Sequence, residues 1–216
     1  GTVEWEFEFS GDYVSAGTPA LGLDGTIYVV ADGRLYAIAP SGIEKWSLKL
    51  GTYTWAYSPP TVSNYSTIYF GLDDGFLYSV NPDGYLKWSV NCGGAIDGSP
   101  TIASDGTVYV HAANPENWSG PQTIGPATLN AISADGVIKW KAKLEHDDYH
   151  STHSSPIIGH DGSIYVVSSV YNGRKDQSAT LYAFAPDGTR NWAVPAGGAT
   201  LASPALGTDG TIYVMS

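Results

Sequence analysis

The stretch LYAFAPDGTRNWAV, residues 181–194, contains two short apolar runs separated by Pro-Asp-Gly. Both runs are rich in the β-branched and aromatic residues that strands prefer. Asp-Gly between two such runs is a strong hairpin signal, because Gly adopts positive φ without steric conflict. The stretch therefore predicts two antiparallel strands, with Leu181 in one and Trp192, eleven residues later, in the other. The same eleven-residue interval recurs from Leu35, Leu77 and Leu129, each ending at a Trp.

A second fixed interval links a proline to the tyrosine at the centre of an Ile/Val-Tyr-Val/Phe run. It is nine residues in all five copies, from Pro19 to Tyr28, Pro60 to Tyr69, Pro100 to Tyr109, Pro156 to Tyr165 and Pro204 to Tyr213. The interval from Tyr to the next Leu varies instead, being 7, 8, 20 and 16 residues. In a four-stranded antiparallel meander, this pattern places short turns on one face and variable connections on the other. Rings of such sheets are β-propellers, so the repeat predicts an all-β propeller.

The predicted domain is one propeller spanning residues 1–216, or a piece of a larger propeller. Its blades are expected at approximately 18–55, 59–97, 99–145 and 155–195, with 1–10 and 203–216 as a partial fifth blade. Two arrangements stay open, namely a five-blade ring sealed by the N-terminal strand and an arc of a larger ring. A tryptophan that recurs on the outermost strand is expected to wedge against the adjacent blade. These structural tryptophans are Trp5, Trp46, Trp88, Trp140 and Trp192.

Composition excludes several classes of protein. The formal net charge of −11 makes nucleic acid an unfavourable partner, because an acidic surface repels phosphate backbones. No run approaches the roughly 18–20 apolar residues of a membrane helix, so membrane insertion is not expected. The single cysteine, Cys92, excludes an internal disulfide and a multi-cysteine metal site. No signal peptide is visible in this chain.

The repeats resemble those of pyrroloquinoline-quinone-type (PQQ-like) propellers, on the stretches SPALGTDGTIYVMS (203–216) and LYAFAPDGTRNWAV. This resemblance implies the propeller fold, in a family that holds both quinoprotein dehydrogenases and non-catalytic outer-membrane assembly or cell-surface scaffolds. The enzymes carry Ala-x-Asp-x-x-Thr-Gly-x-x-x-Trp, whereas AIAPSGIEKW (37–46) is one residue shorter and lacks the Asp and Thr. One cysteine also cannot supply the vicinal pair that many of them use. The resemblance therefore favours a scaffold, and neither PQQ nor another cofactor is expected.

Candidate site residues gather on the predicted variable face. The connection KLEHDDYHSTHSSP (143–156) holds three of the five histidines, and His111 starts an insertion that leaves from the same face. Exposed aromatics at the mouth of a rigid ring, together with polar groups, suit a ligand site. The predicted ligand-binding residues are Tyr53, Trp55, Tyr57, His111, Trp118, Asp147, Asp148, His150 and His153.

The chemistry of the His-rich connection has three readings. His146, His150 and His153 with nearby carboxylates could hold a divalent metal. A histidine beside Asp147 or Asp148 could act as a general base. The third reading is a solvated polar loop.

The predicted function is a non-catalytic scaffold that binds a protein or glycan through its variable face, in an extracellular, cell-surface or periplasmic location. The alternative is an enzyme, either a quinoprotein-like oxidoreductase or a carbohydrate-active lyase or hydrolase, with its site at 145–153. Fold alone does not choose between these classes.

Overall fold

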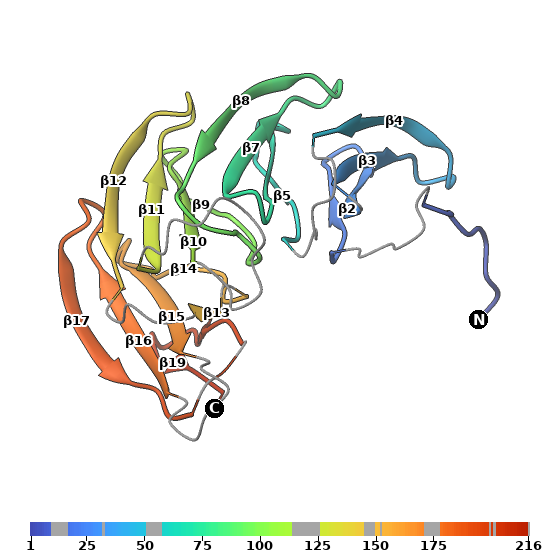
Figure 1. Cartoon of the computed structure of the whole chain (residues 1–216). Coiled ribbons are helices and arrows are strands. Elements are labelled where there is room, and N and C mark those ends of the chain that lie inside the picture. The colour runs from blue at the N-terminus through green and yellow to red at the C-terminus, as the bar shows by residue number, and fades with distance from the viewer. Residues whose placement is uncertain are drawn as a thin grey trace.

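The computed structural model describes residues 1–9, 17–31, 33–50, 58–113, 126–144, 150–151, 153–170, 178–198, 200 and 202–215. Its regular elements in these ranges are all β-strands, arranged as four-stranded antiparallel sheets that follow one another around an open arc (Figure 1). This arrangement confirms the predicted propeller architecture. None of the described residues forms a helix long and apolar enough to span a membrane.

Each blade runs from its innermost to its outermost strand in chain order. Blade one contains β1 (Ala20–Leu21), β2 (Ile27–Ala31), β3 (Arg34–Ile38) and β4 (Glu44–Lys49). Blade two contains β5 (Thr61–Val62), β6 (Ile68–Gly71), β7 (Phe76–Val80) and β8 (Leu86–Asn91). Blade three contains β9 (Thr101–Ile102), β10 (Val108–Ala112), β11 (Thr128–Ile132) and β12 (Ile138–Lys143).

Blade four contains β14 (Ile157–Ile158), β15 (Ile164–Val170), β16 (Ser178–Phe184) and β17 (Arg190–Pro195). A short extra strand, β13 (His150–Ser151), also pairs with β15. The last hairpin, β18 (Ala205–Leu206) and β19 (Ile212–Tyr213), is a separate two-stranded sheet.

The short turns lie on one face of the arc, the turn face, and the other connections lie on the opposite, variable face. Gly occupies the positive-φ position of the turns between first and second strands, as at Gly25 with φ 80°. Blade two is the exception, because Ser66 takes this place with φ 59°. The turns between third and fourth strands use Gly42, Gly84, Gly136 and Gly188.

A row of three residues crosses every blade. In blade one, Tyr28 pairs with Ala37 and Ala37 pairs with Trp46. The small central residue lets the two rings meet above it, with centroids 6.0 Å apart. The same row occurs as Tyr69–Ser79–Trp88, Tyr109–Ala131–Trp140 and Tyr165–Ala183–Trp192.

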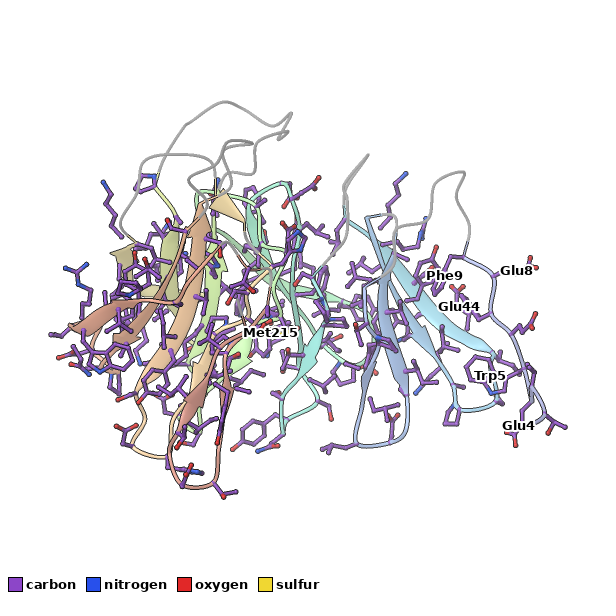
Figure 2. All side chains as sticks on the ribbon, turned by 90° about the horizontal axis from the view of Figure 1, so that it is seen from below. Glu4, Trp5, Glu8, Phe9, Glu44 and Met215 are labelled. Atoms are coloured by element: carbon purple, nitrogen blue, oxygen red, sulfur yellow. The ribbon has the colours of Figure 1, made fainter. Side chains whose placement is uncertain are left out.

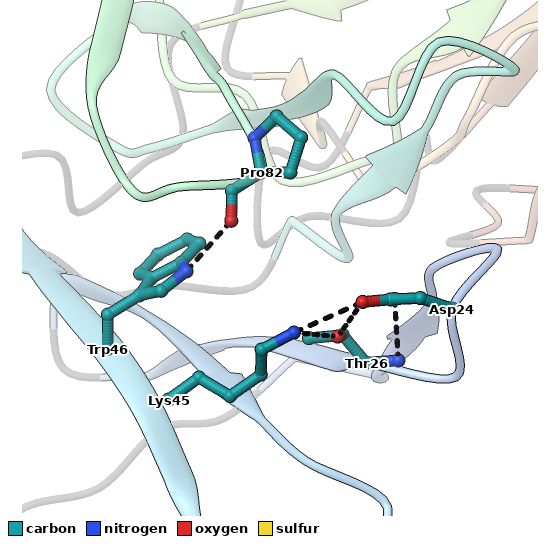
Figure 3. Close-up of polar contacts among 5 residues, drawn as sticks. All are labelled: Asp24, Thr26, Lys45, Trp46 and Pro82. Atoms are coloured by element: carbon teal, nitrogen blue, oxygen red, sulfur yellow. Dashed lines mark hydrogen bonds and ion pairs between the residues drawn. The ribbon is translucent and has the colours of Figure 1, made fainter.

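The tryptophans join each blade to the next one. Nε1 of Trp46 donates a 2.9 Å hydrogen bond to the carbonyl oxygen of Pro82, in the turn between β7 and β8 (Figure 3). Trp5 makes the same bond to Pro40, Trp88 to Ala134 and Trp140 to Pro186, all at 2.9 Å.

A second series of bonds links the blades near the centre of the arc. Thr61 Oγ1 donates to the carbonyl oxygen of Pro100 at 2.7 Å, and Thr101 Oγ1 donates in the same way to Pro156. Ser155 Oγ accepts from the amide of Ser99, and Ser203 Oγ accepts from the amide of Ser155, both at 2.8 Å. Small polar residues beside the prolines thus align the inner strands of blades two to four and the β18–β19 hairpin.

The two ends of the chain lie apart in the arc (Figure 1). Residues 1–9 form no strand and pack on blade one, with Trp5 and Phe9 turned towards it and Glu4 and Glu8 away from it (Figure 2). Phe7 and Phe9 contact the Tyr36 ring edge-on, with centroids 5.8 and 5.2 Å away. Of the two arrangements left open, the ring sealed by the N-terminal strand is not formed in the described structure, because the β18–β19 hairpin contains no residue of this segment.

Candidate functional site

Blade four extends further towards the variable face than the other blades do. Its strands β15 and β16 have seven residues each, whereas the corresponding strands of the other blades have four or five. β13 extends this raised part of the sheet, with His150 opposite Val170 and Ser151 opposite Ser169. Ser169 Oγ donates to the carbonyl oxygen of Thr200 at 2.7 Å. This bond attaches the connection after β17 to the extended part of blade four. The connection after blade three thus approaches the top of blade four.

His111 lies at the top of blade three and breaks the repeat. It is buried, with 1% of its surface exposed, at a position where the other blades have Val30, Gly71 and Val167. It lies opposite Leu129 in the sheet, and Leu129 packs in one cluster with Val166 of blade four. Since paired residues share a face of the sheet, His111 belongs to the interface between blades three and four.

Ser168 supplies a second polar group to the same interface, from blade four. The equivalent positions in the other blades are Ala31, Leu72 and Ala112, all apolar and buried. Ser168 alternates with Val166 along β15, so its side chain is on the face turned towards blade three. Its Oγ is buried and forms no hydrogen bond with the described part of the chain.

Asn130 is a third departure from the repeat, on the other side of blade three. Tyrosine occupies this position in blades one, two and four, as Tyr36, Tyr78 and Tyr182. Asn130 is fully buried, and its Nδ2 donates to Thr128 Oγ1 at 3.0 Å. Its Oδ1 accepts no hydrogen bond from any described residue. Buried polar groups therefore lie on both faces of the blade-three sheet, towards its variable-face end.

Two ionisable groups in blade two, or directly after it, are neutral at ordinary pH. Burial raises the pKa of the Cys92 thiol to about 12, although Lys141 lies nearby. Lys141 Nζ donates to the carbonyl oxygens of Asn91 and Cys92, both at 3.2 Å, and joins blade three to the preceding connection. Burial also raises the pKa of Tyr78, whose hydroxyl donates to Asp74 at 2.5 Å. Both groups therefore stay protonated at neutral pH.

The structure describes only part of the predicted site. His111 is buried as above, and His153 is exposed on the variable face just before β14. His150 is described only through its backbone in β13. His160 lies on the turn face, exposed between β14 and β15. The other predicted residues, Tyr53, Trp55, Tyr57, Trp118, His146, Asp147 and Asp148, lie outside the described ranges.

The metal prediction stays a prediction. Within the described ranges, no three His, Cys, Asp or Glu side chains are grouped as metal ligands would be. His146 lies outside those ranges, and for His150 only the backbone is described.

Ser168 and Asn130 were missed as site residues by the sequence reasoning. Both could have been found by aligning the four complete copies and asking where a polar residue replaces an apolar or aromatic one. An imidazole, a hydroxyl and an amide can each donate and accept hydrogen bonds.

The blades and their tryptophan joints define a PQQ-like repeat propeller. The chain belongs to the family described as outer membrane protein assembly factor BamB, whose profile matches residues 39–174. No curated protein sequence matches the chain.

Solved propellers share the fold at low sequence identity. A protein of unknown function from Bacteroides caccae is 15% identical, with a TM-score of 0.57, over 83% of this chain and 60% of that protein. A europium-containing methanol dehydrogenase is 16% identical, with a TM-score of 0.65, over 88% of this chain and 43% of the enzyme. The Dos1 propeller is 10% identical, with a TM-score of 0.67, over 91% of this chain and 50% of that structure. The chain thus spans about half the length of these structures, and at this identity they show the fold alone.

Proposed function

We propose that the chain is a non-catalytic scaffold that binds a protein partner on its variable face, around the raised top of blade four. The observation that carries this proposal is the coincidence of two departures from the repeat. Blade four has longer strands and the extra strand β13, and polar residues enter the adjoining interface at His111 and Ser168. A rigid frame with one altered region is typical of a binding surface.

The family supports the same function and a location. Its description names an assembly factor for outer membrane proteins, which implies a protein partner and a role outside the cytoplasm. For this chain we infer a periplasmic, cell-surface or extracellular scaffold. A glycan partner, and an enzyme with its site at 145–153, stay as alternatives.

The net negative charge of the chain favours a partner with a basic surface. The chain carries a formal charge of −11, so a partner with a basic surface gains long-range attraction. The exposed positions His153 and Ser178 lie on the variable face, one before β14 and one at the start of β16.

Two double variants with the same chemistry separate the two faces. His153→Arg with Ser178→Arg places two bulky cations on the variable face, and His160→Arg with Ser104→Arg places them on the turn face. All four positions are exposed, so both variants should fold. Partners would be identified by cross-linking and mass spectrometry in extracts of the producing cells, and each affinity then measured with purified proteins.

We expect the variable-face variant to weaken the complex by about tenfold or more, and the turn-face variant to leave it unchanged. The opposite pattern would refute the proposed face. Saturable binding on a glycan array with no protein partner would replace the protein by a glycan. Turnover of a carbohydrate or alcohol, lost in the variable-face variant, would favour the enzyme alternative.

A further inference from the structure

The joint between Trp46 and the turn of blade two is repeated at each blade boundary. In all four copies the indole Nε1 donates to a backbone carbonyl at 2.9 Å. The indole ring also lies over a glycine of the same turn, two residues after the residue whose carbonyl accepts the bond. A Cβ on that glycine would lie within 2.8 Å of the indole. The glycines concerned are Gly42, Gly84, Gly136 and Gly188.

Trp192 is the fifth tryptophan of the series, and in the described part of the chain it contacts no such turn. The described ranges contain four turns between third and fourth strands, and Trp5, Trp46, Trp88 and Trp140 occupy all of them. No hydrogen bond from the Trp192 indole is formed within the described part of the chain, and the side chain is 39% exposed.

The exposure of Trp5 is similar, at 37%, but its cause is different. Trp5 is docked on Pro40 and has no sheet behind it, because residues 1–9 form no strand. Trp192 has the whole of blade four behind it, with the Tyr165 ring 5.8 Å away. The side of the Trp192 indole that faces away from blade four is therefore the side that no described turn contacts.

The strand that carries Trp192 is exposed along its whole length. All six residues of β17 are exposed, whereas β4, β8 and β12 each have partly buried residues at their Trp and two positions later. Val194 is 44% exposed, while the equivalent Leu48 and Val90 pack against hydrophobic clusters. In the other blades, this side of the fourth strand lies against the next blade.

The β18–β19 hairpin covers only the inner part of this face. Ile212 and Val214 pack on Val167 and Leu181 of blade four. In the described structure β19 pairs with β18 alone, while the second strands of the four blades pair on both edges. A free strand edge therefore runs beside the uncovered Trp192 and Val194.

From these observations we propose that the outer face of blade four is a docking site for one β-hairpin of this same repeat. The first strand of the hairpin pairs with the free edge of β19, as β7 pairs with β6. Its turn places a carbonyl oxygen and a glycine under the Trp192 indole, as Pro82 and Gly84 do under Trp46. This site lies at the end of the arc and is independent of the proposed variable-face function.

The chain itself supplies the probe for a test. A peptide of residues 76–91, FLYSVNPDGYLKWSVN, contains both strands of the blade-two hairpin and the turn that Trp46 contacts. Its Tyr78 and Val80 already pack on the preceding blade in this structure. Isolated hairpins are marginally stable, so the two ends of the peptide would be joined covalently to preorganise the hairpin. Binding to the whole chain would be measured by titration calorimetry.

We expect one peptide to bind per chain, with saturation below about 1 mM. Trp192→Phe should weaken binding about fivefold through the lost hydrogen bond, and Trp192→Ala should weaken it further. Trp140→Phe, a matched change at an occupied joint, should leave the affinity unchanged. In the peptide, Gly84→Ala should abolish binding, and Tyr85→Ala, at an outward position, should not.

Three results would overturn the proposal. One is the absence of saturable binding by the closed peptide up to about 1 mM. Another is binding that Trp192→Ala and the Gly84→Ala peptide leave intact. The third is a concentration-dependent dimer, seen by analytical ultracentrifugation and lost in Trp192→Ala, since a second copy of the chain would then be the occupant.

Discussion

Trp46 and Gly84 belong to adjacent blades, and their contact depends on the missing side chain of the glycine. A Cβ added at Gly84 would lie 2.8 Å from Cδ2 of the indole, and the residue has φ +86°. The same indole donates to Pro82 of this turn (Figure 3). The tryptophan of one blade and the turn glycine of the next blade thus form one contact, which holds neighbouring blades together.

Gly84→Ala should destabilise the fold more than an alanine at an ordinary turn glycine. We expect the free energy of unfolding to fall by about 2–4 kcal/mol, from left-handed strain plus overpacking against the indole. Gly106→Ala is the control, because it has φ +82° but its nearest neighbour, Ala134 Cβ, is 3.5 Å away. Its loss should be about 1–2 kcal/mol. Equal losses in urea denaturation would contradict the role of the joint.

Removing one indole nitrogen should matter only where a turn is docked. Trp140→Phe loses the bond to Pro186 and should lower the free energy of unfolding by about 1 kcal/mol. Trp192→Phe, which has no such bond, should be close to neutral. Thermal and urea unfolding of the two variants would measure the difference. A larger loss at Trp192 than at Trp140 would show that the hydrogen bond is not what stabilises the joint.

Ser66→Gly should stabilise the protein. Ser66 is the one described non-glycine residue with positive φ, at 59°, in a turn where the other copies have glycine. Relief of this strain is expected to raise the free energy of unfolding by about 1 kcal/mol. Ser66→Ala keeps the strain and should have little effect. If both substitutions shift the urea midpoint equally, the backbone conformation is not the cause.

Stability should fall at acid pH partly through Asp24. The amide of Thr26 donates to its carboxylate at 3.0 Å, and this contact, with further bonds from the Thr26 hydroxyl and Lys45, lowers the pKa of Asp24 to about 2. Because the folded-state pKa is below the unfolded value of about 3.9, this stabilisation is present above that value and disappears as the pH falls towards 2.

Melting temperatures of the natural chain and Asp24→Asn between pH 6 and pH 2 would test this dependence. The difference between them should be largest at pH 6 and should shrink towards pH 2. Lys45→Met should preserve most of the pH dependence, since the amide of Thr26 is the main cause. A difference that stays constant across this range would contradict the assignment to Asp24.

Cys92 should be unreactive in the folded protein. The thiol is buried, and burial raises its pKa to about 12, so it is protonated at pH 8. We expect a disulfide reagent to modify native protein orders of magnitude more slowly than protein in guanidinium chloride. Because Cys92 is the only cysteine, the absorbance change reports this site alone. Equal rates in both conditions would show that the packing around blade two opens easily.

The fold could be predicted because its signals are local. The interval from Leu77 to Trp88 contains both strands of a hairpin and its turn, so all the residues that shape it are close in the chain. The same is true from Pro60 to Tyr69, which spans β5, a turn and the first half of β6. Fixed spacing was therefore sufficient for strand order and for the face on which each turn lies.

The candidate site could be predicted only in part. His111 was identified from its position at the end of a strand run, but its burial against blade four was not. Ser168 and Asn130 look like ordinary strand residues until their neighbours across the blade interfaces are known. Residues that pack together across a blade interface are far apart in the chain, as Leu129 and Val166 are, which lie 37 positions apart. No local pattern encodes them.

By itself, the sequence determined the blades, because turn geometry and strand alternation depend on residues within about a dozen positions. It also determined the strands that carry Trp46, Trp88, Trp140 and Trp192, whereas the strand expected at Trp5 is not formed. Only the tertiary structure decided which tryptophans are docked, because each joint needs a turn from the following blade. The structure also decided that residues 1–9 and β18–β19 lie apart rather than in one sheet. The curvature of the arc is the sum of side-chain contacts between sheets, which no interval along the chain records.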